Sequence, residues 1–334
     1  MRVRQAIAAA LADEMRRDPA VMLLGEDIAA AEGPFKTSEG LLAEFGPLRV
    51  RDTPIAEMGF TGAAVGAAAM GMRPVIEIMF MEFLGVALDE LVTEAAKFRY
   101  LSKGRFGVPM TVRASIGSGL GFACQHSQTL ENWLTATPGL KVVVPSDAQT
   151  AYGLLRAAIQ DEDPVVVLEP RALYAERGEV VTGDTGIVPL GQARTLTRGD
   201  SATVVALGQT VRSAVNAAAQ TPGLEVIDLA TLVPWDQGTV LASVARTGRL
   251  VTVEEAPAGG GWGAEIVAAV TAKAFRSLQA PPLRITAPDV PVPYSKTLEA
   301  RYCPDTAEIV TQVAAFLKTD DIPAPWWVRE GVLA

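Results

Sequence analysis

Glu57 is the acidic residue whose surroundings point most directly to chemistry. It lies in the stretch DTPIAEMGF, close to Ile55, Met58 and Phe60. An ionised carboxylate drawn out of water by such neighbours is costly unless something binds it. Two plainer interpretations are a charge at a helix N-terminus, which is common, and a solvated loop residue. A capping box does not apply, because Thr53 is four residues away rather than three.

His126 is the only histidine in the chain, and it follows the glycine-rich stretch GSGLGFA at 117–123. A lone histidine is usually structural or solvated. Here, however, a predicted strand, a glycine-rich loop and a helix follow one another, which is where open α/β sheets bind ligands. An imidazole at such a loop titrates near neutral pH and can transfer protons. A Ser-His-Asp triad stays formally open, although no serine lies on a nucleophile elbow, and a metal site lacks further ligands.

The glycine-rich stretches do not match a nucleotide-binding fingerprint. In GSGLGFA, Phe122 stands where the third glycine belongs, and no acidic residue ends a following strand at the usual distance. The stretch AGGGWGAE at 258–265 can cradle an anion on a helix N-terminus, but a tight turn with close helix–sheet packing is the favoured interpretation. No P-loop and no GxSxG motif occurs in the sequence, which disfavours a Rossmann dehydrogenase.

Composition is typical of a globular protein. Of the 334 residues, 49 % are apolar and 20 % charged, enough for two domains with their own cores. The net charge of −9, without a basic run, argues against nucleic-acid binding. Two cysteines are too few for a disulfide framework. The N-terminus reads as an amphipathic helix rather than a signal peptide, and the stretch VIEIMFMEFLGVAL is too short to span a membrane. We therefore expect a cytoplasmic protein.

In the first half of the chain, predicted strands alternate with predicted helices, and these elements must position Glu57 and His126. Short β-branched runs predict strands at 21–27, 73–80, 108–115, 140–146 and 164–170. Helical patterns cover 3–17, 60–71, 82–101, 128–135 and 147–160. Continuous apolar strands that alternate with helices indicate an α/β fold with a parallel sheet flanked by helices on both faces. The glycine- and alanine-rich run GFTGAAVGAAAMG allows a helix to approach another backbone closely, as at a subunit interface.

A second, smaller α/β domain is expected after a change of rhythm. The predicted organisation is a first domain at 1–170, an extended linker at 171–200, a second domain at 201–320 and a tail at 321–334. The second domain contains expected strands at 202–207, 224–229 and 249–255, and helices at 210–220, 235–246, 262–276 and 305–318. The tail carries Trp326 and Trp327 in a proline-rich context, so we expect it to dock on a surface, either of this chain or of a partner.

Several longer motifs, taken together, resemble one family. The chain contains LLGEDI, the stretch RVRDTPIAEMGFTGAAVGAAAMGMRPVIEIMFMEF, AAKFRY, QHSQTLENW, PGLKVVVPSDAQTAYGLLRAAIQDEDPVVVLEPRALY, VIDLATLVPWD, TGRLVTVEEAPAGGGWGAEI and APDVPVPYSKTLE. In this order they resemble the beta subunit of the thiamine diphosphate-dependent component of 2-oxoacid dehydrogenases, over residues 1 to about 318. The resemblance implies a transketolase-like fold, with a pyrimidine-binding domain followed by the transketolase C-terminal domain.

The resemblance also implies roles for particular residues. Glu57, in the TPIxE motif, would hydrogen-bond the ring nitrogen of the cofactor's aminopyrimidine and share a proton with it, and Phe83 would stack on that ring. His126, in QHSQ, would transfer protons or hydrogen-bond the substrate. Glu26, in LLGED, would link the two active sites of the assembly. The expected cofactor-contacting residues are Glu57, Phe83, Met79, Ile55 and Glu26.

The metal-binding half of the cofactor site has no counterpart in the sequence. Related enzymes hold the diphosphate through Mg²⁺ with a GDG motif and a later asparagine, and neither RGDSA nor TGDTG has such a sequel. The resemblance implies that an alpha subunit supplies this half in an α₂β₂ heterotetramer. It also implies a potassium ion bound by backbone carbonyls, with the matching residues Met110, Ala158, Ile159, Asp161 and Asp163.

The expected function is oxidative decarboxylation of a 2-oxoacid, pyruvate by default, with acyl transfer to the lipoyl groups of a core acyltransferase. Acetoin and branched-chain 2-oxoacid dehydrogenases of the same family are alternatives, and a non-catalytic scaffold subunit is an alternative of a different class. Two departures from the family leave the substrate open. Ala136 stands where many members have a second histidine, and Met79 where many have glutamine.

Overall fold

The computed structural model describes residues 1–329, and the chain divides into two compact units. The first unit contains residues 1–116, 133–190 and 232–234, whereas the second contains 117–132, 191–231 and the chain from Trp235 onward. The segment with His126 thus leaves the first unit and belongs to the second. The order of predicted elements along the sequence does not reveal this exchange.

The first unit is built on a seven-stranded sheet. Its strands are β1 (Val21–Gly25), β2 (Val50–Asp52), β3 (Arg73–Ile78), β4 (Thr111–Ile116), β5 (Lys141–Val143), β6 (Val165–Pro170) and β10 (Thr231–Val233). The strand order is β10-β5-β6-β4-β3-β1-β2, and the neighbours from β5 to β2 run parallel. The predicted parallel sheet is confirmed. All residues of β4 and β6 are buried, as expected for strands covered on both faces.

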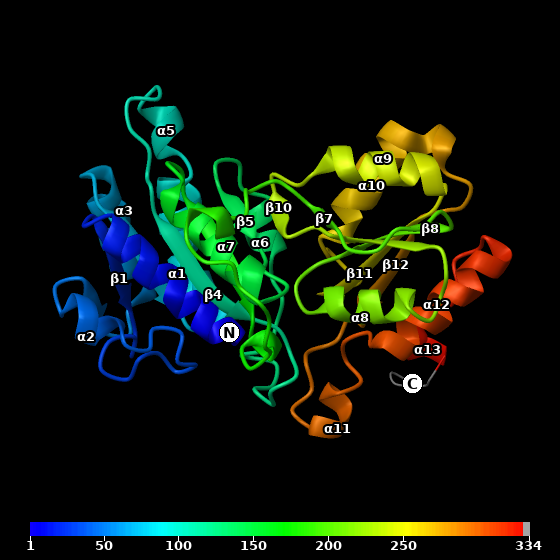
Figure 1. Cartoon of the computed structure of the whole chain (residues 1–334), viewed down its shortest axis with the longest axis horizontal. Helices are drawn as coiled ribbons and strands as arrows, with labels where there is room; N and C mark the ends of the chain where they lie inside the picture. The colour runs from blue at the N-terminus through cyan, green and yellow to red at the C-terminus, as the bar shows by residue number, and fades with distance from the viewer. Residues whose placement is uncertain (330–334) are drawn as a thin grey trace. The chain divides into compact units, whose positions relative to one another are not determined.

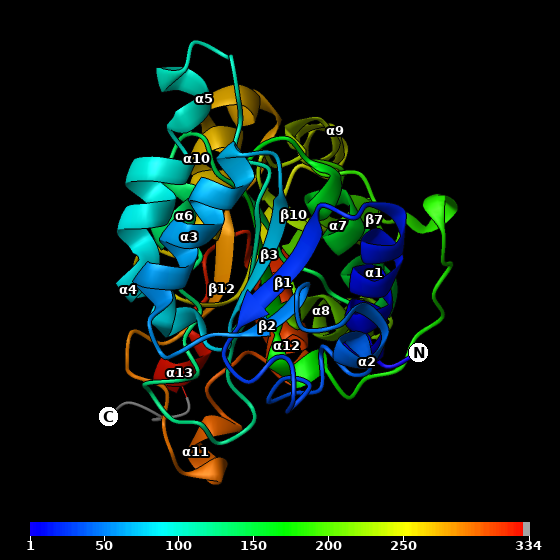
Figure 2. The same cartoon turned by 90° about the vertical axis from the view of Figure 1, so that its left-hand side faces the viewer.

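Helices cover both faces of this sheet. The helices are α1 (Val3–Arg17), α2 (Leu41–Phe45), α3 (Glu57–Ala69), α4 (Leu84–Leu88), α5 (Phe98–Leu101), α6 (Asn132–Thr135) and α7 (Ala148–Gln160). Helices α1 and α7 pack together on one face, and α3 and α4 lie on the other (Figure 2). A buried ion pair joins α1 to α7, with Arg156 Nε 2.6 Å from Glu14 Oε1.

The single helix expected at 82–101 is wrong. The chain instead forms a 3₁₀ turn η1 (Met81–Phe83), α4, a π-helical segment η2 (Asp89–Ala95) and α5. The Ala96 amide donates to the Leu91 carbonyl at 3.0 Å, which is the five-residue spacing of a π-helix. The apolar pattern of the sequence does not register such a change of pitch. The helix expected at 128–135 is likewise reduced to α6, because residues 117–131 form a loop.

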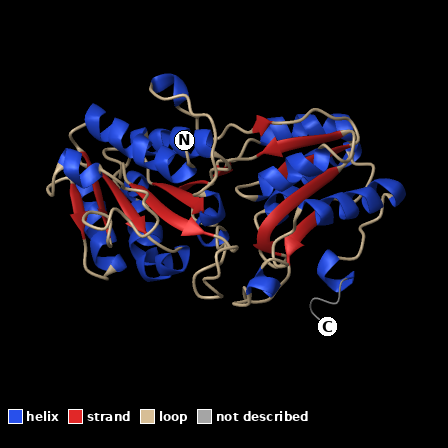
Figure 3. Ribbon diagram, turned by 60° about the horizontal axis from the view of Figure 1, so that its bottom comes forward, coloured by secondary structure: helices blue, strands red, loops and turns tan. Residues whose placement is uncertain are grey.

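The second unit contains a five-stranded sheet of order β12-β11-β8-β9-β7. Its strands are β7 (Arg194–Thr195), β8 (Ala202–Ala206), β9 (Leu224–Asp228), β11 (Leu250–Pro257) and β12 (Leu283–Ala287), and only β7 pairs antiparallel. Helices α8 (Thr210–Ala218) and α12 (Thr306–Thr319) lie together on one face, and α9 (Gln237–Thr247) and α10 (Gly263–Ala274) on the other (Figure 1). Figure 3 shows the strands of each unit flanked by helices.

Short elements complete the described chain. The predicted linker contains the 3₁₀ turns η3 (Arg171–Leu173) and η4 (Asp184–Gly186), and its strand β7 joins the second sheet. The turn η5 (Phe275–Ser277) follows α10, and the short helices α11 (Lys296–Glu299) and α13 (Trp326–Arg329) flank α12 in the sequence. Within residues 1–329, no helix combines the length and the apolar character needed to cross a bilayer.

The tail docks on the second unit through Trp326, as predicted. Its side chain is buried in the core with Phe316 and Ile285, and its indole N–H donates to the Thr286 carbonyl at 3.1 Å. Trp327 packs against the same core and contacts the Trp326 ring edge-on, with centroids 5.8 Å apart. The remainder of the predicted tail, residues 330–334, lies outside the described residues.

Candidate active site

The carboxyl ends of three neighbouring strands bring four of the predicted residues to one edge of the first sheet. Glu26 directly follows β1, Glu57 begins α3 just after β2, and Met79 directly follows β3. Phe83 ends the turn η1, four residues farther on. Strands β2 and β3 pair with opposite edges of β1, so the chain changes direction across the sheet there. Ligands of open α/β sheets bind at such a switch point.

Glu57 is the first residue of α3 and is 8 % exposed. The helix N-terminus, a region of partial positive charge, therefore lies beside its carboxylate. Phe60 is buried nearby, but Ile55 is 84 % exposed and Met58 54 %. Glu57 is thus buried, although Ile55, in the connection from β2 to α3, and Met58, within α3, expose their own side chains.

Glu26 is a second carboxylate close to Glu57. Burial raises the pKa of Glu26, and the neighbouring negative charges of Glu57 and Asp27 raise it further. Its Oε1 atom is buried and has no hydrogen-bond partner within residues 1–329, and the same holds for the hydroxyls of Thr53 and Thr61. Buried polar atoms are nearly always hydrogen-bonded in native proteins. This edge of the sheet therefore presents acceptors that the described chain leaves unsatisfied.

An aromatic cluster fixes the position of Phe83. Its ring contacts Phe80 edge-on at 5.7 Å between centroids, and Phe80 in turn contacts Phe35 at 5.8 Å. The Arg171 guanidinium lies 5.0 Å from the centre of the Phe80 ring, and its Nη1 donates to Ser115 Oγ at 3.0 Å. The Ser115 hydroxyl donates to the Met79 carbonyl. The two predicted cofactor-contacting residues Met79 and Phe83 thus share one buried scaffold.

A buried ion network lies within the same unit. The guanidinium of Arg113 on β4 forms two hydrogen bonds with the Glu169 carboxylate, at 2.7 and 2.9 Å, and one with Glu77 at 2.5 Å. Tyr174 donates to Glu169 at 2.7 Å, and Thr37 donates to Glu77 at 3.1 Å. Burial alone would lower the pKa of Arg113, but the charges of Glu169 and Glu77 raise it. Sequence reasoning treated β4 as an ordinary buried strand and missed this network.

His126 belongs to the second unit, so the structure does not bring it together with Glu57 within one compact unit. It is half-buried, and its amide donates to the Ala123 carbonyl at 3.3 Å in a tight turn. The next residue, Ser127, has a buried hydroxyl without a hydrogen-bond partner in the described chain. The loop that carries His126 is anchored at its start, where the amide and hydroxyl of Ser118 donate to Glu255 at 2.6 and 2.8 Å.

Glu131 lies at the far end of the same loop and was not singled out from the sequence. Burial raises the pKa of Glu131 to about 8, with smaller contributions from the charges of Glu255 and Glu254. No motif marks this residue as buried, because it stands between a leucine and an asparagine in a polar stretch.

The second glycine-rich stretch, 258–265, is a tight turn, as favoured from the sequence. The amide of Gly263, at the start of α10, donates to Glu254 Oε2 at 3.0 Å. A Cβ atom on Gly263 would lie 2.0 Å from Glu254 Oε1, so any larger residue would have to displace this carboxylate. The helix N-terminus is therefore occupied by a carboxylate of the chain itself, which also pairs with Arg284 at 2.9 Å.

Four of the five carbonyls predicted to bind potassium already accept hydrogen bonds. Those of Ile159 and Asp161 accept from Arg73 Nη1, at 3.1 and 3.0 Å. Those of Ala158 and Met110 accept backbone amides, at 3.2 and 3.1 Å. Arg73 thus places a fixed positive charge at two of the five predicted ligands, and the potassium site stays a prediction.

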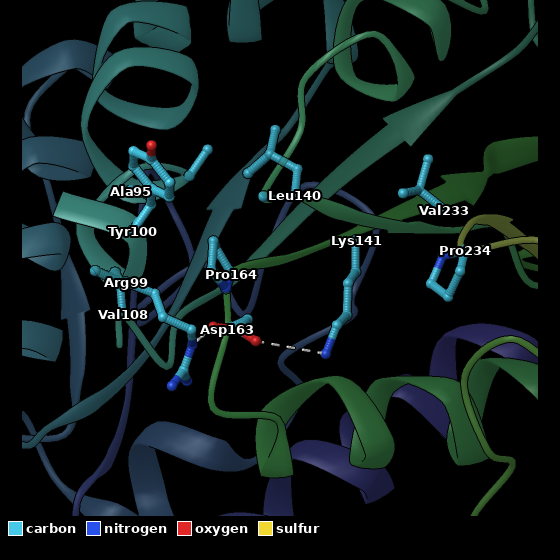
Figure 4. A pocket seen from close by; sticks show the side chains of 12 residues that line it. Ala95, Arg99, Tyr100, Val108, Leu140, Lys141, Asp163, Pro164, Val233 and Pro234 are labelled. Atoms are coloured by element: carbon cyan, nitrogen blue, oxygen red, sulfur yellow. Dashed lines mark hydrogen bonds and ion pairs between the residues drawn. The ribbon is translucent and has the colours of Figure 1, made fainter. Parts of the chain in front are cut away.

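A cavity of about 480 Å³ lies in the first unit but not at the edge that carries Glu57. Its walls include Tyr100, Leu140 and Pro234, and Asp163 lies at its margin with Arg99 and Lys141 on either side (Figure 4). Asp163 pairs with Arg99, and its carboxylate lies 3.8 Å from Lys141 Nζ. Of the residues predicted to bind cofactor or metal, only Asp163 lines this cavity.

The fold and the two domain matches define a transketolase-like protein. Residues 1–177 match the transketolase pyrimidine-binding domain, and residues 191–309 match the transketolase C-terminal domain. The structure of a split-gene transketolase, described as an inactive beta4 tetramer, superposes with a TM-score of 0.77 over 96 % of this chain and 99 % of that chain, at 24 % identity. This likeness confirms the predicted two-domain α/β fold.

Proteins with higher sequence identity to this chain than the split-gene transketolase identify its family more closely. The chain is 44 % identical to the pyruvate dehydrogenase E1 component subunit beta of Rhizobium meliloti (strain 1021), over 94 % of this chain and 69 % of that protein. It is 42 % identical to the acetoin:2,6-dichlorophenolindophenol oxidoreductase subunit beta of Bacillus subtilis (strain 168), over 92 % of this chain and 94 % of that protein. The chain therefore belongs to the family of beta subunits of 2-oxoacid dehydrogenase E1 components, as its motifs predicted.

Proposed function

We propose that the chain is the beta subunit of an α₂β₂ 2-oxoacid dehydrogenase that decarboxylates pyruvate with thiamine diphosphate. Family membership implies dependence on thiamine diphosphate. The observation that carries the proposal is the pair Glu26 and Glu57 at the switch point of the first sheet. One carboxylate oxygen there is buried without a partner in residues 1–329, and the two side chains lie close enough for one charge to raise the pKa of the other.

The buried oxygen atoms without partners in residues 1–329 suit the aminopyrimidine half of the proposed cofactor. A buried acceptor without a partner costs about 1–3 kcal/mol. An aminopyrimidine offers N–H groups to such acceptors and a ring nitrogen to a protonated carboxyl group. The hydroxyls of Thr53 and Thr61 add two groups that can donate or accept. The Mg²⁺ and diphosphate half is proposed to be held by the alpha subunit, since residues 1–329 contain no cluster of three side chains suited to a metal ion.

Glu57 is proposed to hold a proton at its carboxyl oxygen and to share it with the aminopyrimidine ring nitrogen. Its place at the start of α3 fixes the carboxyl group on a rigid element. When bound, thiamine diphosphate supplies the nucleophilic carbon and the electron sink for decarboxylation. Glu26 keeps a second carboxyl group near Glu57, and burial together with the charges of Glu57 and Asp27 raises its pKa.

Aromatic and apolar side chains orient the ring in this proposal. Phe83, held edge-on by Phe80, offers a face for stacking. Met79 follows β3 beside it, and its carbonyl is fixed by Ser115. Ile55 is largely exposed in this chain, and we propose that it covers the cofactor when the alpha subunit is bound.

His126 is proposed to hydrogen-bond the substrate carboxylate or to move a proton at the reacting centre. Its position on a loop that follows a strand of the first sheet supports this role. The product acyl group is proposed to pass to a lipoyl group of a core acyltransferase. Acetoin is a second candidate substrate, because the similarity to the acetoin enzyme subunit nearly equals that to the pyruvate enzyme subunit.

Co-expression with an alpha subunit and a panel of substrates tests this function. Reduction of an artificial electron acceptor with pyruvate supports the proposal. Activity only with acetoin or branched-chain 2-oxoacids would show that pyruvate is not the substrate. The competing scaffold hypothesis predicts that Glu57→Gln and His126→Ala leave the complex fully active. The enzyme hypothesis predicts a loss of roughly 10²- to 10⁴-fold in turnover, as for removal of a general acid or base, while the complex still assembles.

A further inference from the structure

The loop that leads to His126 has a backbone that few sequences can adopt. Gly117, Gly119 and Gly121 have φ angles of +93°, +101° and +77°, which lie in the left-handed region. Glycine reaches this region freely but loses more conformational entropy on folding than any other residue. Its two large apolar side chains are only partly buried, because Leu120 is 49 % exposed and Phe122 38 %. Contacts to the loop backbone therefore matter for its conformation.

Glu299 anchors this backbone from 178 to 180 residues farther along the chain. The Gly119 amide donates to its Oε1 atom at 2.8 Å. The Gly121 amide donates to Oε1 at 3.1 Å and to Oε2 at 2.9 Å. Glu299 ends the short helix α11 and is 5 % exposed. Hydrogen bonds to an ionised acceptor are roughly twice as strong as those between neutral groups.

We propose that Glu299 is a positioning residue for His126, an inference that rests on the role proposed above for this histidine. The carboxylate fixes two alternate amides of the loop, and His126 follows only five residues after the second. Glu255 fixes the preceding residue, Ser118, so consecutive turns of the loop are held by two carboxylates of the second unit. Loss of either amide contact frees the glycine-rich backbone and moves the imidazole.

The variants Glu299→Gln and Glu299→Asp, made in the assembled complex with its alpha subunit, test this inference. Glutamine can accept with one oxygen only and turns a donor toward the loop amides. Turnover of Glu299→Gln should fall roughly 10- to 100-fold, the cost expected when a catalytic group is misplaced by about 1 Å, with an unchanged KM for thiamine diphosphate. Aspartate keeps both acceptor oxygens and should lose less. Glu265→Gln, an exposed glutamate on α10, is the matched control.

Two further measurements separate positioning from general damage. Hydrogen exchange of the peptide that contains residues 117–126 should speed up in Glu299→Gln, while the melting temperature of the second unit stays close to that of the control. In a His126→Ala background, Glu299→Gln should change turnover by less than about twofold, because residues that act as a unit are not additive.

Each outcome decides a different point. Unchanged loop exchange and unchanged turnover in Glu299→Gln overturn the inference. An equal loss of turnover in the presence and absence of His126 overturns it as well, since Glu299 would then act through another group. If His126→Ala alone has no effect, the role proposed for His126 fails, and loop exchange still decides whether Glu299 holds the backbone.

Discussion

Two groups of carboxylates with buried oxygen atoms in the first unit have opposite surroundings. Glu77 and Glu169 surround the guanidinium of Arg113, and each accepts further hydrogen bonds, from Thr37 and Tyr174 respectively. Around Glu26, by contrast, the charges that shift its pKa are also negative, and one of its oxygens has no partner in the described chain. Glu77 and Glu169 lie within strands β3 and β6, whereas Glu26 follows β1 and Glu57 begins α3, at the carboxyl edge of the same sheet.

Under the proposed function, the contrast separates residues that hold the fold from residues that are kept for a ligand. Proteins pair their buried charges wherever the only task is stability, and they depart from this rule mainly at functional sites. The Arg113 network satisfies its members within the chain. Around Glu26, one buried oxygen has no partner in residues 1–329, and under the proposed function a bound molecule supplies its donor. The predictions below test this division.

The largest effect is expected for Glu57→Gln. Turnover of the assembled enzyme should fall roughly 10²- to 10⁴-fold, because the amide cannot give a proton to the cofactor ring. The melting temperature of the cofactor-free chain should not fall, since the substitution removes a charge that lies near Glu26. A variant with nearly full turnover, or one that fails to fold, would contradict the assignment of Glu57 to the ligand.

Arg113→Met should produce the opposite pattern. Removing the guanidinium leaves two buried carboxylates unpaired, which is expected to cost about 3–5 kcal/mol in the free energy of unfolding, measured with denaturant. Arg16→Met is the control, because its ion pair with Glu44 is exposed and solvent-screened, so its loss should change the free energy of unfolding little. Adding Glu77→Gln and Glu169→Gln to Arg113→Met should restore part of the loss. Equal effects of Arg113→Met and the control would show that the network does not hold the fold.

Glu131→Gln tests a buried carboxyl group of the second unit, through the pH dependence of the free energy of unfolding. The carboxyl group of Glu131 has a pKa of about 8 in the folded chain and an ordinary value of 4.5. Between these values the folded chain binds more protons than the unfolded chain, so the free energy of unfolding falls as pH rises. The stabilisation from the protonated Glu131 carboxyl group is complete below pH 4.5 and is lost as the pH rises through about 8. Glu131→Gln should therefore raise the melting temperature more at about pH 8 than at about pH 5. A difference independent of pH would contradict the burial of an uncharged Glu131.

Glu26→Gln should have the smallest effect on stability. Burial and the charges of Glu57 and Asp27 raise the pKa of Glu26, so its ionised form is disfavoured in the folded chain. The neutral amide should raise the melting temperature at neutral pH, and this gain should vanish as pH falls below the ordinary pKa of 4.5. Turnover should fall less than in Glu57→Gln. Destabilisation at neutral pH would show that Glu26 has a structural partner.

Much of the fold follows from local sequence signals. The predicted starts of three helices agree with the structure within two residues, because Asp147, Asp236 and Asp305 cap them by accepting an amide three residues on. Apolar β-branched runs located the long central strands. The short strands β2, β7 and β10 were missed, since two or three residues carry no detectable period. The strand β12 was also missed, although it is longer.

The candidate site was predicted in part. The resemblance of the motifs supplied Glu57, Glu26, Met79 and Phe83, and the structure places these at one edge of the first sheet. The anchor Glu299 and the Arg113 network could not be derived from the sequence. Each depends on residues that are distant in the chain and adjacent only after folding, and neither leaves a periodic pattern.

A crystal structure of the complex with its alpha subunit and thiamine diphosphate tests the central claim most directly. The account predicts that a carboxylate oxygen of Glu57 lies within hydrogen-bond distance, about 2.6–3.2 Å, of the aminopyrimidine ring nitrogen. It also predicts that the unpartnered oxygen of Glu26 gains a hydrogen bond, directly or through water. A Glu57 side chain that faces solvent while the ring binds elsewhere would contradict it.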